Sequence, residues 1–137
     1  MINLEMGGNV IALTLSENVT GDYGKDGQFL FKFYSNATKA TKYFLSTDLN
    51  NGNESEYRYN KFNILLVPTE AEEDLNAGVI YLPNTGFYEY TIYAQLVPNI
   101  EPQPTDLEVE YGRVFYGFNE ATITSFSPDI ETIIYNG

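Results

Sequence analysis

The segment from Thr85 to Leu96, TGFYEYTIYAQL, decides the fold class of this chain. Its even-numbered positions carry a continuous apolar row: Tyr88, Tyr90, Ile92, Ala94 and Leu96. The odd-numbered positions are mixed and include two aromatic residues, Phe87 and Tyr93. Since successive side chains of a strand point to opposite faces of a sheet, this period of two predicts a strand whose even positions face a core.

The same alternation recurs along the chain, whereas the spacing of an amphipathic helix is almost absent. It marks six further segments: residues 11–15, 28–35, 42–47, 57–67, 78–83 and 107–118. Short strands separated by Asn-, Gly- and Pro-rich turns predict an all-β domain. We expect an antiparallel β-sandwich of about seven strands, immunoglobulin-like or jelly-roll-like, with a small barrel as the alternative. The sandwich should occupy residues 1–118, and residues 119–137 should form a C-terminal arm or an additional strand.

Three local features refine this expectation. The apolar parity of residues 107–118 changes across Gly112, which predicts a β-bulge at that glycine. Residues 69–77 predict one helical turn, with Thr69 as N-cap and Glu72 completing a capping box. The proline-rich segment 97–106 predicts an extended hairpin connection rather than a strand.

Composition removes several classes of function. Seven basic against nineteen acidic residues give a net charge of −12, which disfavours nucleic acid and anionic membranes as partners. The chain has no cysteine and no histidine, so it lacks thiolate chemistry and the commonest acid/base and zinc-binding side chain. The N-terminus has no basic segment typical of a signal peptide, and no stretch is long and apolar enough to span a membrane. These features disfavour an enzyme but leave reactions of carboxylates, tyrosine, lysine or serine open. They predict a protein made in the cytoplasm.

Two polar segments are candidates for cation binding or carboxylate chemistry. One holds three oxygen donors close together: Asp48, Asn50 and Asn51. It lacks the ligand spacing of an EF-hand loop, which favours a hairpin tip. The other is a run of four acids: Glu70, Glu72, Glu73 and Asp74. Adjacent acids on a turn are typical of a solvated surface, so we predict no catalytic, cofactor or metal site.

Partner-binding candidates come from two places. Phe87 and Tyr93 lie on the face of their strand opposite the core, where they could pack across strands, contact another protein or stack on a sugar ring. The C-terminal arm carries a large apolar surface: Ile123, Phe126, Ile130, Ile133, Ile134 and Tyr135. The arm could cover an open edge of its own sheet or add to the surface of a neighbour.

Six short motifs resemble a known family. They are the apolar strand 9–15, the FLFKF strand 29–33, R-x-N-K-F at 58–62, D-L-x-A-G at 74–78, G-x-Y-x-Y-x-I-Y-x-Q at 86–95 and V-x-x-G-x-V at 109–114. In this order they resemble the small β-sandwich virion structural proteins of tailed phages of Bacteroidota, including crAss-like phages. The resemblance covers roughly residues 9–116, and the segment after Phe118 departs from the short ending of that family.

The resemblance implies a virion protein with no enzymatic activity, made in the host bacterial cytoplasm. It implies an auxiliary (decoration) protein on the outside of the capsid, bound to the major capsid protein or other virion proteins in many copies or as a homo-oligomer. The alternatives are a component of the neck, tail or head fibre, or a glycan-binding β-sandwich module.

Overall fold

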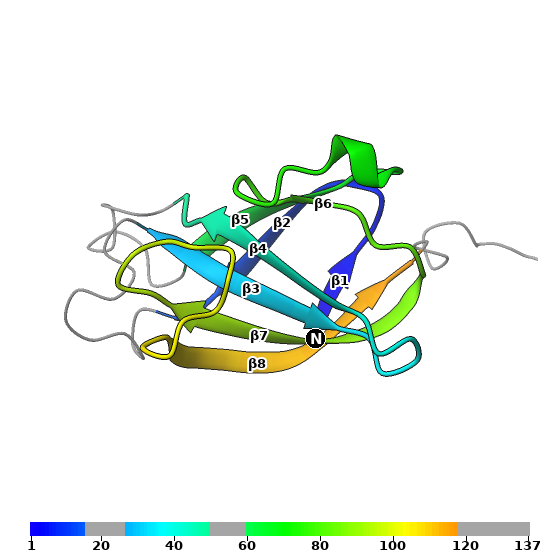
Figure 1. Ribbon diagram of the computed structural model, residues 1–137. Coiled ribbons are helices and arrows are strands. Elements are labelled where there is room, and N and C mark those ends of the chain that lie inside the picture. Colours follow the sequence, from blue (N-terminus) through cyan, green and yellow to red (C-terminus); the bar gives the residue numbers. More distant parts are fainter. Residues whose placement is uncertain (16–26, 50–59, 118–137) are drawn as a thin grey trace, which may run out of the picture.

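The computed structural model describes residues 1–15, 27–49 and 60–117 (Figure 1). These residues form eight strands and one short 3-10 helix: β1 (Ile2–Leu4), β2 (Gly7–Leu13), β3 (Gln28–Tyr34), β4 (Thr41–Thr47), β5 (Asn60–Leu66), η2 (Glu70–Glu72), β6 (Val79–Ile80), β7 (Gly86–Ala94) and β8 (Leu107–Tyr116). The predicted all-β sandwich is confirmed.

The strands lie in two sheets, a five-stranded sheet in the order β1-β8-β7-β3-β4 and a three-stranded sheet in the order β2-β5-β6. An arrangement with β8, β7, β3 and β4 in one sheet and β2 and β5 in the other follows the immunoglobulin-like strand order, in which G, F, C and C′ oppose B and E. The pairs β1–β8 and β5–β6 are parallel, so the sandwich is not fully antiparallel as predicted.

The parallel pair β1–β8 has a local cause at the N-terminus. The chain crosses from β1 in one sheet to β2 in the other over only two residues, Glu5 and Met6. Gly7, with φ of 96°, adopts the left-handed region that makes such a reversal possible. Alternation alone does not reveal that one N-terminal run is divided between two sheets.

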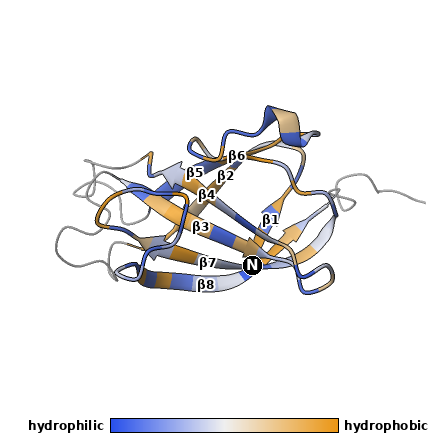
Figure 2. Cartoon of the chain, in the orientation of Figure 1, coloured by the Kyte–Doolittle hydropathy of each residue, from blue (hydrophilic) through white to orange (hydrophobic). Residues whose placement is uncertain are grey.

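Between the sheets lies an aromatic core supplied largely by β3. Phe29, Phe31 and Phe33 all point inward and are at most 3% exposed. Phe62 of β5 approaches the rings of Phe29 and Phe31 edge-on, with centroids 5.7 Å and 5.1 Å apart. Such edge-to-face contacts add to the hydrophobic effect of burial. Hydrophobic residues accordingly dominate β3, whereas the segment around η2 is mostly hydrophilic (Figure 2).

The segment TGFYEYTIYAQL is the central strand β7, paired with β3 on one side and β8 on the other. Tyr88, Tyr90, Ile92 and Ala94 are buried, so the predicted inward face is confirmed. The row ends there, because Leu96 lies beyond the strand and is 42% exposed.

The β-bulge predicted at Gly112 lies elsewhere. Gly112 pairs regularly with Tyr90. The register shifts further along, since Ile92 faces Glu110 and Tyr93 faces Glu108, which leaves Val109 as the extra residue of β8. The parity of β8 therefore changes three residues earlier than predicted.

Gly112 has a different structural role: its lack of a side chain leaves space for the ring of Tyr90. A Cβ atom at this position would lie 2.8 Å from Cε1 of Tyr90, closer than real Cβ contacts allow. The Tyr90 ring lies against the backbone of Gly112, and its hydroxyl donates a 2.6 Å hydrogen bond to Oε2 of Glu110. Burial, together with this carboxylate acceptor, raises the pKa of Tyr90 well above its ordinary value.

The helical turn predicted for residues 69–77 is only partly correct. The helix is a single 3-10 turn, and Thr69 donates to the Glu72 carboxylate (2.9 Å) instead of capping a backbone N–H. Backbone groups that would continue the helix are used elsewhere: the Leu75 carbonyl accepts from the N–H of Leu45 on β4, at 2.7 Å. After this single turn, the segment covers the edge of β4 and does not continue as a helix.

Candidate binding surface

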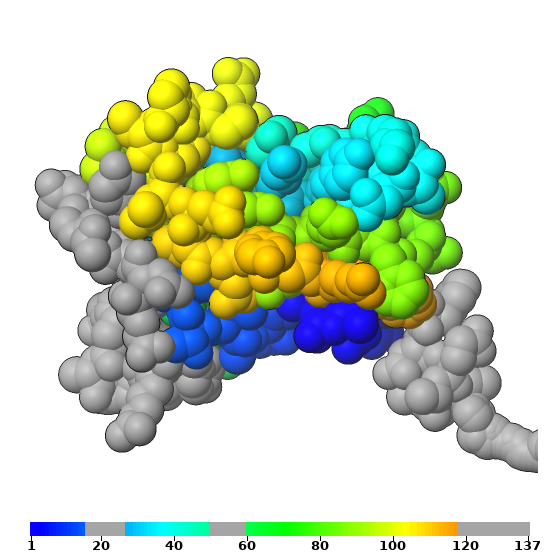
Figure 3. All heavy atoms as spheres, turned by 90° about the horizontal axis from the view of Figure 1, so that it is seen from below, coloured from blue at the N-terminus to red at the C-terminus, as the bar shows by residue number. Residues whose placement is uncertain are grey.

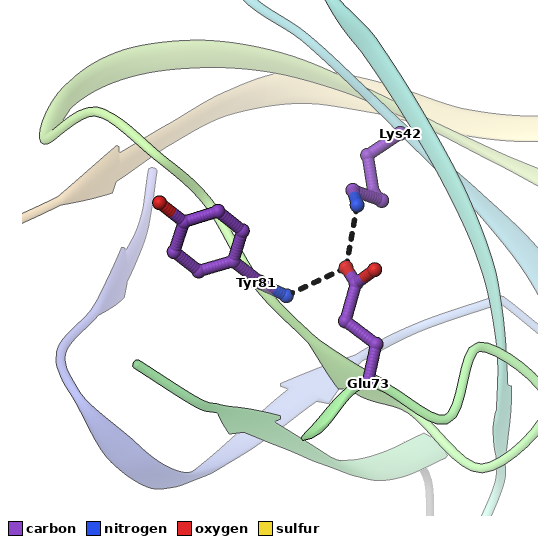
Figure 4. Close-up of polar contacts among 3 residues, drawn as sticks. All are labelled: Lys42, Glu73 and Tyr81. Atoms are coloured by element: carbon purple, nitrogen blue, oxygen red, sulfur yellow. Dashed lines mark hydrogen bonds and ion pairs between the residues drawn. The ribbon is translucent and has the colours of Figure 1, made fainter. Parts of the chain in front are cut away.

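The acidic run contributes a structural clamp. Glu73 accepts a hydrogen bond from the Lys42 ammonium at 2.5 Å and one from the backbone N–H of Tyr81 at 2.8 Å (Figure 4). The Glu73 side chain is only 10% exposed. This carboxylate ties β4 to the segment between η2 and β7. Its hydrogen-bond donors are Lys42 and Tyr81 of the same chain, which gives Glu73 a structural role.

Asp48 is also structural. Its side chain is buried and accepts hydrogen bonds from Nδ2 of Asn60 (2.7 Å) and from the N–H of Lys61 (2.9 Å). These bonds join the end of β4 to the start of β5. Asn50 and Asn51 lie outside the described residues. Within residues 1–15, 27–49 and 60–117, no three acidic side chains come together in a way that could hold a metal ion.

The outer face of the five-stranded sheet, opposite the core, is the candidate binding surface. Figure 3 looks onto it, with β1 (blue), β8 (orange), β7 (green) and β3 (cyan) side by side. Strand alternation places six aromatic residues here, all exposed or half-buried: Tyr34, Tyr43, Phe87, Tyr93, Tyr111 and Phe115. Aromatic side chains are therefore abundant on both faces of this sheet.

One end of the outer face is covered. The connection between β7 and β8, yellow in Figures 1 and 3, folds over it. Gln95 and Asp106 fasten this connection at its base, because Nε2 of Gln95 donates to Oδ2 of Asp106 at 3.1 Å. Leu30 and Leu45, which are cross-strand neighbours on this face, are buried. The predicted proline-rich hairpin connection is thus confirmed, and it also covers part of the sheet.

Tyr93 belongs to this covered end. It is half-buried and pairs with Leu30 on β3. Burial, followed by the charge of Glu108, raises the pKa of its hydroxyl. This position favours packing across strands among the three alternatives for Tyr93.

Phe87 lies at the open end of the face. Its ring contacts Phe115 across the strands, with centroids 5.1 Å apart and planes tilted by 57°, yet it remains 58% exposed. Six positions along a strand separate it from Tyr93, which is about 20 Å at the usual rise per residue. The two predicted aromatics therefore do not form one platform.

Beside Phe87 is a shallow hollow of about 360 Å³. Its lining comes from the turn after β3, from β7 and from β8: Asn36, Ala37, Phe87, Tyr88, Glu89 and Arg113. Glu89 stands directly opposite Arg113 in the β7–β8 register and accepts a 2.7 Å hydrogen bond from Nδ2 of Asn36. An exposed aromatic ring and three planar polar groups thus meet at one place.

Sequence reasoning missed several of these residues. Tyr111 is the most exposed aromatic of the face at 76%, because the parity of β8 changes at Val109 and not at Gly112 as predicted. Asn36, Glu89 and Arg113 are unremarkable in sequence, and only the strand order brings them together. The arm candidates, residues Ile123 to Tyr135, lie outside the described residues.

Comparisons with known proteins add no assignment. No protein family, curated protein or solved structure matches this chain. Among the described residues, no helix has the length and apolar character needed to cross a membrane.

Proposed function

We propose that this protein is a non-enzymatic structural component of a phage virion, an auxiliary protein bound to the outside of the capsid shell. The observation that carries the proposal is the aromatic outer face of the five-stranded sheet, where Phe87 and Tyr111 are 58% and 76% exposed. Exposed aromatic residues on a sheet are typical of protein contacts.

Two further properties support the proposal. The polar clusters that could have carried chemistry, around Asp48 and Glu73, are occupied by protein hydrogen bonds. The net charge of −12 suits an outer layer better than contact with packaged DNA. That the particle is a phage virion rests on the resemblance of the six sequence motifs to virion structural proteins of tailed phages.

Attachment is assigned to two elements, the outer sheet face and the C-terminal arm of residues 119–137. A chain shortened to residues 1–118 retains every described strand, so we expect it to fold. Full-length and shortened proteins would be supplied to particles that lack the wild-type chain, and their occupancy compared after purification. Lower occupancy of a folded shortened chain is expected, whereas equal occupancy would remove the arm from the proposal.

Copy number tests the position in the particle. Mass spectrometry of purified virions should find hundreds of copies for a shell protein. About a dozen copies would instead indicate a neck, tail or fibre component, and absence from the particle would overturn the virion assignment.

A further inference from the structure

We propose that the hollow beside Phe87 binds a short segment of an uncharged oligosaccharide. The site goes beyond the virion role and does not depend on it, because it can be measured on the isolated protein. Its volume of about 360 Å³ lies at the lower end of the range of small-molecule sites, roughly 300–1,000 Å³, which fits one or two sugar rings.

The apolar part of the site is the aromatic ring of Phe87, which forms its floor. Phe87 is held in place by Phe115, which lies opposite it on β8 and contacts its ring. More than half of the Phe87 side chain is nevertheless in contact with water. The C–H face of a pyranose can cover such a ring, which removes apolar area from water while the sugar hydroxyls stay at the edge.

The polar part stands next to this floor. Nδ2 of Asn36 donates to one carboxylate oxygen of Glu89 at 2.7 Å, which brings the two side chains together. The second carboxylate oxygen and the amide oxygen of Asn36 remain as acceptors. The Arg113 guanidinium carries five N–H donors, and within the part of the chain that the structure describes no hydrogen bond of this group is seen.

This combination matches neighbouring sugar hydroxyls better than other ligands. Hydroxyls both donate and accept, and planar carboxylate, amide and guanidinium groups can engage two of them at once. A phosphate would be repelled by the Glu89 carboxylate and by the overall charge of −12. A lipid chain would leave the three polar groups without partners.

Two other exposed or half-buried aromatics of this face, Tyr93 and Tyr111, lie outside the hollow. Tyr93 is excluded from the site, since it lies about 20 Å along the strand from Phe87. Tyr111 provides a matched control, because it is aromatic, lies on the same face and is 76% exposed, yet does not line the hollow.

The experiment begins with the full-length protein on an array of uncharged glucose, galactose, mannose and N-acetylglucosamine oligosaccharides. The hexasaccharide with the strongest signal is then titrated by NMR into wild type, Phe87→Ala, Arg113→Gln and Tyr111→Ala. Loss of one aromatic or one charged contact should weaken binding by about tenfold. Tyr111→Ala should bind as wild type does, and thermal unfolding would verify that each variant folds.

Three results would overturn the proposal: a blank array, unchanged affinity of folded Phe87→Ala, or equal loss in Tyr111→Ala. If the array is blank but Phe87→Ala lowers occupancy on particles, the hollow is a protein contact and the virion proposal survives. If saccharide binding is found but the protein is absent from particles, the site stands and the virion proposal falls.

Discussion

The two faces of the five-stranded sheet are built from similar residues and differ in what covers them. The inner face carries Phe29, Phe31 and Phe33, which are almost completely excluded from water by the second sheet. The outer face carries Phe87 and Tyr111, which remain more than half exposed. Aromatic content therefore does not distinguish a core from a binding surface, and the presence of an opposing layer does.

Removing one ring of the opposing sheet that covers the inner face should have the largest effect. Phe62→Ala deletes a fully buried ring that contacts Phe29 and Phe31, and the cavity left behind should lower the free energy of unfolding by about 3–5 kcal/mol. Phe87→Ala, the matched change on the outer face, should cost less than about 1 kcal/mol. Urea unfolding of both variants tests the comparison, and similar losses would contradict it.

A polar contact at the rim of the inner face should come next. Glu73→Ala leaves the Lys42 ammonium and the Tyr81 N–H without their shared acceptor, which should cost about 1–3 kcal/mol. Lys42→Met should cost less, because the Tyr81 bond is kept and the lysine stem is replaced by an apolar chain of similar length. If Lys42→Met is the more damaging change, the clamp does not work through the Tyr81 N–H.

Substitution of Gly112, which lies against the Tyr90 ring, should have an intermediate effect on the free energy of unfolding. Gly112→Ala forces the Tyr90 ring away from its position and from Glu110, at a cost of about 1–3 kcal/mol. In a Tyr90→Leu background the same substitution should cost much less, since the ring is gone. A double-mutant cycle by thermal unfolding measures this coupling, and additive effects would rule out the ring as the cause.

The smallest effect is confined to alkaline solution. Burial and Glu110 raise the pKa of Tyr90 above its ordinary value of 10.0, so the folded protein holds this proton more tightly than the unfolded chain. The resulting stability is complete below pH 10 and is lost as the pH rises further. Tyr90→Phe should therefore lose less stability than wild type above pH 10, as measured by urea midpoints across that range. Parallel pH profiles would show that Tyr90 does not contribute.

Much of the architecture could be predicted from local pattern. The alternation in TGFYEYTIYAQL assigned Tyr88, Tyr90 and Ile92 to the core, and they are buried. The bulge was misplaced because a glycine within a strand can mark either a β-bulge or a position where a neighbouring side chain packs against the backbone. Which one applies depends on the Tyr90 ring, which belongs to another strand.

The sequence by itself determined that this protein is an all-β domain, which face of β7 turns inward, and that histidine- and cysteine-based chemistry is excluded. Only the tertiary structure decided that Tyr93 is partly covered, that Phe87 stays open, and that Asn36, Glu89 and Arg113 meet beside it. The physical reason is that alternation fixes the direction of a side chain within its own strand. Its neighbours depend on strand order and register, which are set by contacts between distant segments.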